Sequence, residues 1–214
     1  MLKKLLALLI VPILGCAASP EKVYTHTKDK VVKIGMILDK ANKEGKLEHW
    51  KGSCSGAFIS HSGLVLTCAH CFSDPGITKI FIKTDDGRVS QGFVLKIDTK
   101  QDLALVQSFF LYTPYFDLGK EVIRGQKVMS FGSSLGMQHT MTVGYVSNLS
   151  TDGLQYIFHT AFILPGNSGG PLVDEHGHLV GVNEANLMLN FLVPAAGYYL
   201  AIDLPVVKAF LGIK

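Results

Sequence analysis

Three residue types that can cooperate in nucleophilic catalysis occur in separate segments of this 214-residue chain. Ser168 lies in the glycine-rich run GNSGG, His70 follows the apolar run LVLTCA, and Asp102 opens the apolar run LALV. A serine hydroxyl becomes a nucleophile when a histidine accepts its proton and a carboxylate orients that histidine. Each residue alone also has an ordinary structural explanation: a turn, a structural histidine and a surface carboxylate. No single motif decides between these interpretations.

Short apolar runs separated by turn residues fill the chain from Val31 onward, and their spacing predicts an all-β sandwich or barrel. The runs divide into six and six around residues 112 to 120, which suggests two similar halves. A helix is predicted only for LPVVKAFL near the C-terminus, with Asp203 as its N-cap and Pro205 in its first turn. The expected strands are 31–37, 56–60, 63–68, 79–83, 92–97, 103–107, 127–131, 141–147, 155–160, 170–173, 178–183 and 198–202.

The run GNSGG also fits the G-x-S-x-G pattern of α/β-hydrolases. Those enzymes need the order serine, acid, histidine on alternating strands and helices, whereas only 46 residues follow Ser168 and most have a strand pattern. His176 and His178, in DEHGHL, are expected in a hairpin turn and not at a metal, because no third ligand is evident.

The N-terminal sequence MLKKLLALLIVPILGC predicts export. Two lysines precede an apolar run at 5–14 that is too short to span a bilayer. The end of this run, ILGC, resembles a bacterial lipobox. We therefore expect residues 1–15 to be removed as a signal peptide and Cys16 to be lipidated and to anchor the protein in the membrane. Cleavage of an ordinary signal near residue 17 is the alternative. The polar residues 16–30 are expected to form a tether.

Composition favours one exported globular unit. Hydrophobic residues make up 48% of the chain and charged residues 17%, which suits a single sizeable core. Removal of residues 1–15 leaves 18 basic and 17 acidic side chains, a net charge of +1, and no basic stripe, so nucleic acid is not an expected partner. Cys54, Cys68 and Cys71 form an odd set in an oxidising compartment, which predicts one disulfide and one free thiol.

The three motifs together resemble trypsin-like serine peptidases. In that family the histidine lies in a T-A-A-H-C run, the acid opens a D-L-A-L strand and the serine lies in G-[DN]-S-G-G-P, in the same order as here. The segments VMSFGSSLGMQHTMTVGYVSN, PGNSGGPLV, HLVGVN and GYYLAIDLPVVKAFL are similar to the HtrA-type peptidases of bacterial envelopes. The likeness extends from about Val31 to Leu211.

The resemblance implies a chymotrypsin-like fold for residues 31–214. Two six-stranded antiparallel β-barrels, formed by 31–115 and 116–214, would be followed by the short C-terminal helix. The resemblance also implies a disulfide between Cys54 and Cys71, which stand 17 residues apart around the histidine.

The resemblance further implies a catalytic triad of Ser168, His70 and Asp102. Ser168 would attack the peptide carbonyl, His70 would carry the proton, and Asp102 would fix the histidine tautomer. The backbone N–H groups of Gly166 and Ser168 would form the oxyanion hole. No cofactor and no metal are expected.

The substrate pocket is expected to involve Phe162, Ile163, Val182 and Glu184. Because residues 162 and 163 are not acidic, a preference for lysine or arginine is not expected, and medium-sized apolar residues are the expected preference. Glu184 could face solvent or favour a basic or polar substrate position, and the sequence leaves this open.

Several residues depart from the patterns of related enzymes. Asn167 stands where digestive enzymes carry an aspartate that pairs with a newly cut N-terminus, so we expect no such activation. Cys68 replaces a small residue beside His70, and we expect it to be a buried small hydrophobe. The resemblance includes no PDZ domain, so trimer formation and peptide-triggered activation are not carried over, and the oligomeric state stays open.

The resulting hypothesis is a lipid-anchored serine endopeptidase that faces the periplasm and acts on polypeptides in envelope protein quality control or processing. A secreted or soluble periplasmic peptidase is one alternative. A non-catalytic binding or chaperone module on a peptidase fold is another, although such modules usually lose a triad member and all three are present here.

Overall fold

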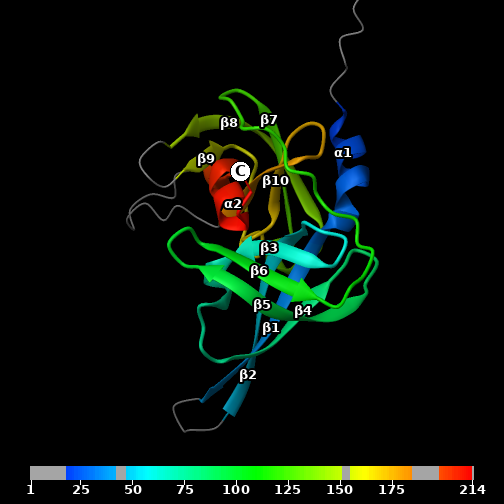
Figure 1. The fold of residues 1–214 in the computed structure, drawn as a ribbon, viewed down its shortest axis with the longest axis vertical. Coiled ribbons are helices and arrows are strands. Elements are labelled where there is room, and N and C mark those ends of the chain that lie inside the picture. The colour runs from blue at the N-terminus through cyan, green and yellow to red at the C-terminus, as the bar shows by residue number, and fades with distance from the viewer. Residues whose placement is uncertain (1–17, 42–46, 151–154, 185–197, 214) are drawn as a thin grey trace, which may run out of the picture.

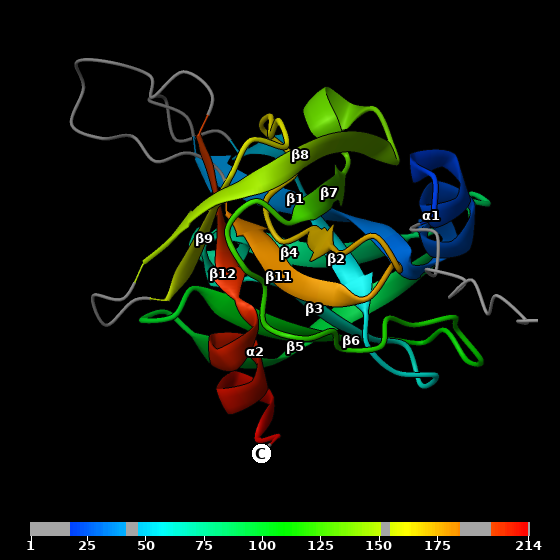
Figure 2. The same cartoon turned by 90° about the horizontal axis from the view of Figure 1, so that it is seen from above.

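The structure of the chain is a computed structural model that describes residues 18–41, 47–150, 155–184 and 198–213 (Figures 1 and 2). The predicted signal peptide at 1–15 and the predicted lipidation site Cys16 lie outside the described residues. Among the described residues, no helix has the length and apolar content that crossing a membrane requires.

The described elements are twelve strands, two α-helices and three short 3-10 helices. In chain order they are α1 (Pro20–Thr27), η1 (Lys28–Lys30), β1 (Val31–Ala41), β2 (Leu47–Phe58), β3 (Leu64–Cys68), η2 (Ala69–Phe72), β4 (Ile77–Lys83), β5 (Val89–Asp98), β6 (Leu103–Ser108), β7 (Lys127–Gly132), η3 (Ser134–Gly136), β8 (Thr140–Leu149), β9 (Tyr156–His159), β10 (Pro171–Val173), β11 (Leu179–Glu184), β12 (Tyr199–Asp203) and α2 (Leu204–Leu211).

The strands close into two antiparallel barrels, one below the other in Figure 1. The first barrel has the order β1-β2-β3-β6-β5-β4, and the second has the order β10-β11-β12-β9-β8-β7. This architecture confirms the predicted chymotrypsin-like double barrel. Helix α2 follows the second barrel, and its N-cap Asp203 accepts a hydrogen bond from the Leu204 N–H at 2.7 Å.

Strand β2 is much longer than the sequence predicted, because the prediction covered only its apolar end at 56–60. Its preceding residues, LEHWKGSCS, are mostly polar and carry no strand periodicity. They nevertheless pair with β1 along its whole length, from Val31 opposite Ala57 to Ala41 opposite Leu47. Tertiary pairing therefore extends this strand where local hydrophobicity does not.

Residues 20–30 form helix α1 and η1, where the sequence predicted a tether. Pro20 occupies the first turn, and the Thr27 hydroxyl donates a hydrogen bond to the Val23 carbonyl at 2.7 Å. The side chains of Val23 and Thr27 are buried, and the Tyr24 ring stacks on Phe131 of β7 at a centroid distance of 6.2 Å. Only two residues of this short helix are buried, so its sequence carries no clear apolar periodicity from which a helix could have been predicted.

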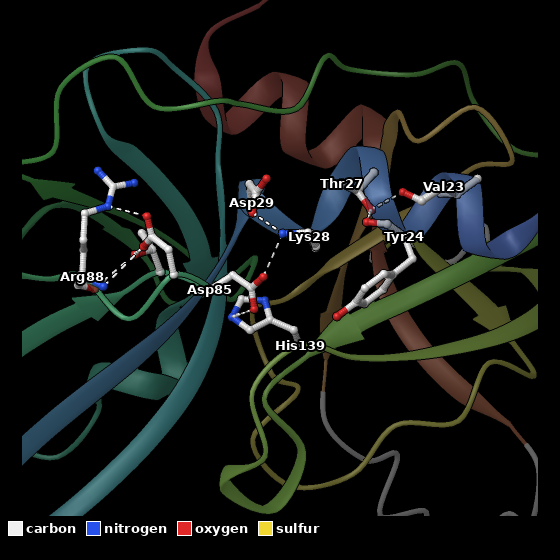
Figure 3. A network of polar contacts seen from close by, with 10 residues as sticks. Val23, Tyr24, Thr27, Lys28, Asp29, Asp85, Arg88 and His139 are labelled. Atoms are coloured by element: carbon white, nitrogen blue, oxygen red, sulfur yellow. Dashed lines mark hydrogen bonds and ion pairs between the residues drawn. The ribbon is translucent and has the colours of Figure 1, made fainter.

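A polar network joins η1 to both barrels (Figure 3). The Lys28 ammonium donates to the carboxylates of Asp29 at 2.8 Å and Asp85 at 3.0 Å. Asp85 lies in the turn between β4 and β5, and its carboxylate is 3.5 Å from Nε2 of His139. Because His139 precedes β8, this network connects the first barrel to a loop of the second.

Candidate active site

His70 is held by Asp102 at two points. Strand β3 runs into η2, which presents His70 at the surface with 43% of its side chain exposed. Its ring Nδ1 lies 2.6 Å from Asp102 Oδ2, and its backbone N–H donates to Asp102 Oδ1 at 2.7 Å. The hydrogen bond to Asp102 is the main cause that raises the pKa of His70, and burial opposes it. The carboxylate therefore fixes the ring and favours its protonated form.

Asp102 adopts a left-handed backbone conformation, with φ of 52°. This region is uncommon for residues other than glycine, although aspartate tolerates it better than most. Its carbonyl accepts a hydrogen bond from the Ala69 N–H at 3.1 Å, and the next residue, Leu103, pairs with Cys68 across β6 and β3. These contacts hold the unusual conformation and direct the carboxylate toward His70.

A disulfide ties the His70 segment to the first barrel. It joins Cys54 of β2 to Cys71 of η2, whose Cα atoms are 6.3 Å apart. The third cysteine, Cys68, is free and fully buried at the end of β3, and its thiol donates to the carbonyl of Asn183 at 3.4 Å.

Ser168 lies in the turn between β9 and β10, with 5% of the residue exposed. Ser55, on β2 of the first barrel, holds this turn twice. Its backbone N–H donates to the Ser168 carbonyl at 2.8 Å, and its hydroxyl donates to the Gly166 carbonyl at 2.6 Å. The N–H of Gly169 donates to Asn183 of β11 at 2.8 Å. The turn that carries Ser168 is therefore fixed between the two barrels.

Gly169 brings this turn against the segment that leads to His70. A Cβ atom at Gly169 would lie 2.0 Å from the Thr67 hydroxyl and 2.9 Å from the Cys68 nitrogen, and its φ is 81°. Only glycine fits this contact. The structure thus places the segments of Ser168, His70 and Asp102 together, although they are far apart in sequence.

Gly166 and Asn167 shape the turn on its other side. Gly166 has φ of 101°, and a Cβ atom there would lie 2.3 Å from the Ser133 carbonyl oxygen. The buried Asn167 accepts a hydrogen bond from the Ser134 hydroxyl at 2.6 Å. Among the described residues, none accepts a hydrogen bond from the N–H of Gly166 or Ser168. Both N–H groups therefore lack an acceptor among the described residues and can donate hydrogen bonds to another group.

The four residues expected at the substrate pocket have different surroundings. Phe162 is 48% exposed and meets the ring of Tyr199 edge-on at 5.2 Å. Ile163 is buried, and Val182 is fully buried within the hydrophobic core. The residues that follow Glu184, from 185 to 197, lie outside the described residues. Phe162 is therefore the one member of this set with a large exposed apolar surface.

Glu184, whose role the sequence left open, lies close enough to His70 and Asp102 for their charges to interact. Its Oε2 is buried, and the Tyr156 hydroxyl is a neighbour that lowers the pKa of this carboxyl. Burial raises the pKa of Glu184, and the charge of Asp102 raises it further. Burial beside this carboxyl also raises the pKa of Tyr156 to about 12. Glu184 follows Asn183 on β11, and the Asn183 carbonyl accepts hydrogen bonds from the Gly169 N–H and the Cys68 thiol.

Comparison with known proteins gives matches over most of the described chain. Residues 54–182 match the family described as trypsin-like peptidase domain. The putative serine protease HhoB of Synechocystis sp. is 35% identical over 146 residues, which cover 63% of this chain and 35% of the relative. The mitochondrial serine protease HTRA2 of Drosophila persimilis is 32% identical over 168 residues, which cover 73% of this chain and 38% of the relative.

Solved structures match the same architecture. A structure of the HtrA-type protease AlgW with a decapeptide has a TM-score of 0.80 at 23% identity, over 91% of this chain and 65% of that one. At this identity the likeness concerns the fold alone. This chain spans little more than a third of the length of the two curated relatives.

Proposed function

Because this chain belongs to the trypsin-like peptidase family, we propose that it is a serine endopeptidase that cleaves polypeptides with Ser168, His70 and Asp102. The observation that carries the proposal is the His70–Asp102 pair, joined at 2.6 Å, beside the turn of Ser168. A surface histidine has no structural need for a carboxylate that binds both its ring and its backbone. A histidine that acts as a general base needs such a carboxylate, because the tautomer and the orientation of its ring must be fixed.

The chemistry follows from the proton positions. Asp102 accepts a hydrogen bond from the Nδ1–H of His70 and stays ionised, so Nε2 carries a lone pair and can accept the proton of the Ser168 hydroxyl. The serine oxygen then bonds to the peptide carbonyl carbon, and the N–H groups of Gly166 and Ser168 stabilise the negative oxygen. His70 returns the proton to the leaving amine, which departs and leaves an acyl-enzyme. Water repeats the cycle and releases the second product.

The substrate position next to the cleaved bond is proposed to be apolar. The exposed Phe162, on the turn that precedes Ser168, packs edge-on against the half-buried Tyr199 of β12. Neither contributes a negative charge, so a medium-sized apolar side chain fits better than lysine or arginine. Comparing cleavage of peptides that differ only at this position tests the preference. Faster cleavage after arginine than after valine or leucine would contradict it.

Ser168→Ala tests the proposed function directly. We expect the variant to lose casein cleavage and labelling by a fluorophosphonate probe, while its circular dichroism stays that of the wild type. Ser62→Ala, at an exposed serine between β2 and β3, is the matched control and should keep both activities. Cleavage by the Ser168 variant at the parental rate would refute the assignment. A wild-type protein that binds unfolded polypeptide but neither cleaves nor reacts with the probe would instead indicate a non-catalytic module.

We further propose that the mature protein begins at a lipidated Cys16 and works at the envelope, facing the periplasm. The support is the ILGC sequence at 13–16 together with the HtrA-type relatives, and two or more acyl chains give stable anchoring. Cys16→Ser should release the protein to the soluble fraction or leave it unprocessed. The intact mass of the wild-type protein is the check, and a mature, lipid-free N-terminus at Ala17 or later would exclude the anchor.

A further inference from the structure

Three potential metal ligands meet at the proposed catalytic pair. The sulfur of Cys68, a ring nitrogen of His70 and a carboxylate oxygen of Asp102 all lie within 4.8 Å of one another. They come from the end of β3, from η2 and from the residue before β6. Thiolate, imidazole and carboxylate are the three side-chain types that bind zinc in proteins. The proposed peptidase mechanism uses His70 and Asp102 but gives Cys68 no role.

The charged groups that act on this cluster are carboxylates. Burial and the charges of Asp102 and Glu184 raise the pKa of the Cys68 thiol. The charge of Glu184 also acts on His70, and Tyr156 is a neighbour that stabilises the charged form of this carboxyl. No lysine or arginine is among the described groups that shift the pKa of Cys68, His70 or Glu184. The charges that act on the Cys68 thiol are therefore negative, and a bound cation would neutralise them.

We propose that Cys68, His70 and Asp102 form an inhibitory binding site for a thiophilic divalent cation of the zinc and cadmium class. On binding, the Cys68 thiol loses its proton to solvent, and the sulfur, a His70 nitrogen and an Asp102 oxygen each form a bond to the cation. Because zinc lies about 2.0–2.3 Å from its ligands, the 2.6 Å contact between His70 and Asp102 must open. The half-exposed His70 ring provides that freedom and the route from solvent.

The disulfide does not compete for this cation. The sulfurs of Cys54 and Cys71 also lie within 4.8 Å of a His70 nitrogen, but they are bonded to each other and offer no thiolate. Cys68 is therefore the one thiol of the described residues available at this place. The loss of activity rests on the proposed function, because a metal-bound His70 can no longer take the proton of Ser168. The binding itself does not depend on it.

The first experiment measures binding without activity. Ser168→Ala protein is titrated with Zn²⁺ and Cd²⁺ in competition with a chromophoric chelator, and the ultraviolet absorption of a cadmium–thiolate bond is recorded. We expect one ion per chain, a thiolate band, and at least a tenfold weaker affinity after the further change Cys68→Ala. Cys68→Ser, which keeps the size of the side chain, is a second variant in case alanine disturbs folding. Absence of binding, or equal affinity with and without Cys68, would overturn the proposal.

The second experiment measures inhibition. Wild-type protein should lose peptidase activity in Zn²⁺ or Cd²⁺ and regain it with EDTA, and Cys68→Ser should need at least tenfold more metal. His176→Ala removes an exposed histidine elsewhere and should leave the inhibition unchanged. Equal inhibition of wild type and Cys68→Ser would refute the site. Wild-type protein without activity in EDTA would count against the proposed function alone, because the binding titration would still decide the metal site.

Discussion

Two of the histidine–aspartate pairs among the described residues have the same residue types but opposite shifts of the histidine pKa. His70 lies 2.6 Å from Asp102, with 43% and 17% of the two side chains exposed. His139 lies 3.5 Å from Asp85, with 3% and 27% exposed. The pKa of His70 is raised, whereas the pKa of His139 is lowered. A neighbouring aspartate is therefore not sufficient to raise the pKa of a histidine.

The difference arises from burial and from a third charge. For His70 the hydrogen bond to Asp102 exceeds the cost of burial. For His139 burial dominates, and the positive charge of Lys28 opposes the attraction of Asp85. Figure 3 shows the reason: Asp85 faces the Lys28 ammonium as well as the His139 ring. Because Lys28 offsets the negative charge of Asp85, this aspartate stabilises the protonated form of His139 only weakly.

The largest expected difference between the pairs is catalytic. Asp102→Asn should lower turnover by a factor on the order of 10⁴, because the amide favours the wrong histidine tautomer, as it does in well-studied serine proteases. Asp85→Asn should leave turnover within a few-fold of the wild type. Steady-state cleavage of one peptide by the two variants measures this. Similar losses in both would show that the pairs do not differ in the way proposed.

The next effect concerns how each histidine segment is held. The segment of His70 is closed by the Cys54–Cys71 disulfide, with a sequence separation of 17, whereas the bonds around His139 in Figure 3 are non-covalent. A disulfide that closes a loop of this size stabilises the folded state by roughly 3 kcal/mol, because it restricts the unfolded chain. The double change to serine at residues 54 and 71 should therefore lower the free energy of urea unfolding by about that amount. Thiol counting on unfolded, unreduced wild type should find Cys68 alone reactive among the three, and three reactive thiols would contradict the pairing.

A third histidine extends the comparison to full burial without a carboxylate partner. His159 is fully buried, and burial lowers its pKa to about 4. The unfolded chain takes up this proton near pH 6.5, and the folded protein does so only near pH 4. Stability from this residue is therefore present above pH 6.5 and is lost as the pH falls to about 4, by up to roughly 3 kcal/mol.

His159→Gln tests this linkage. The variant should lose less unfolding free energy than the wild type between pH 6.5 and 4, whatever its absolute stability. Chemical denaturation at a series of pH values gives both slopes. Parallel curves for the two proteins would show that His159 does not titrate differently on folding.

The smallest predicted effect tests how much Glu184 contributes to the raised pKa of His70. Glu184→Gln removes a negative charge that helps to raise it, so the pKa of His70 should fall. Because the base must be neutral, the acid limb of the kcat/KM profile should move to lower pH, and the variant should keep more of its activity in acid. The profile is measured in EDTA. An acid limb that moves to higher pH would contradict the charge argument.

Local sequence patterns determined the main features of the fold. Alternating and continuous apolar runs marked the twelve strands, and the split near residues 112 to 120 matched the division into two barrels. Asp203 and Pro205 marked the start of α2. Such features depend on neighbours within a few residues, so periodicity and capping residues record them. Polar stretches without periodicity, in α1 and in the first half of β2, escaped the prediction because their partners come from other elements.

The sequence by itself determined which residues could do chemistry, since His70, Asp102 and Ser168 lie in motifs with recognisable neighbours and order. Only the tertiary structure decided what surrounds them. It placed Gly169 against Thr67, brought Glu184 and Asp102 close enough for their charges to interact, buried Cys68 near Asp102, and paired Asp85 with Lys28. Burial and charge at a titratable group are set by side chains that folding brings from distant segments. The same histidine–aspartate pairing can therefore raise the pKa of one histidine and leave the pKa of another lowered.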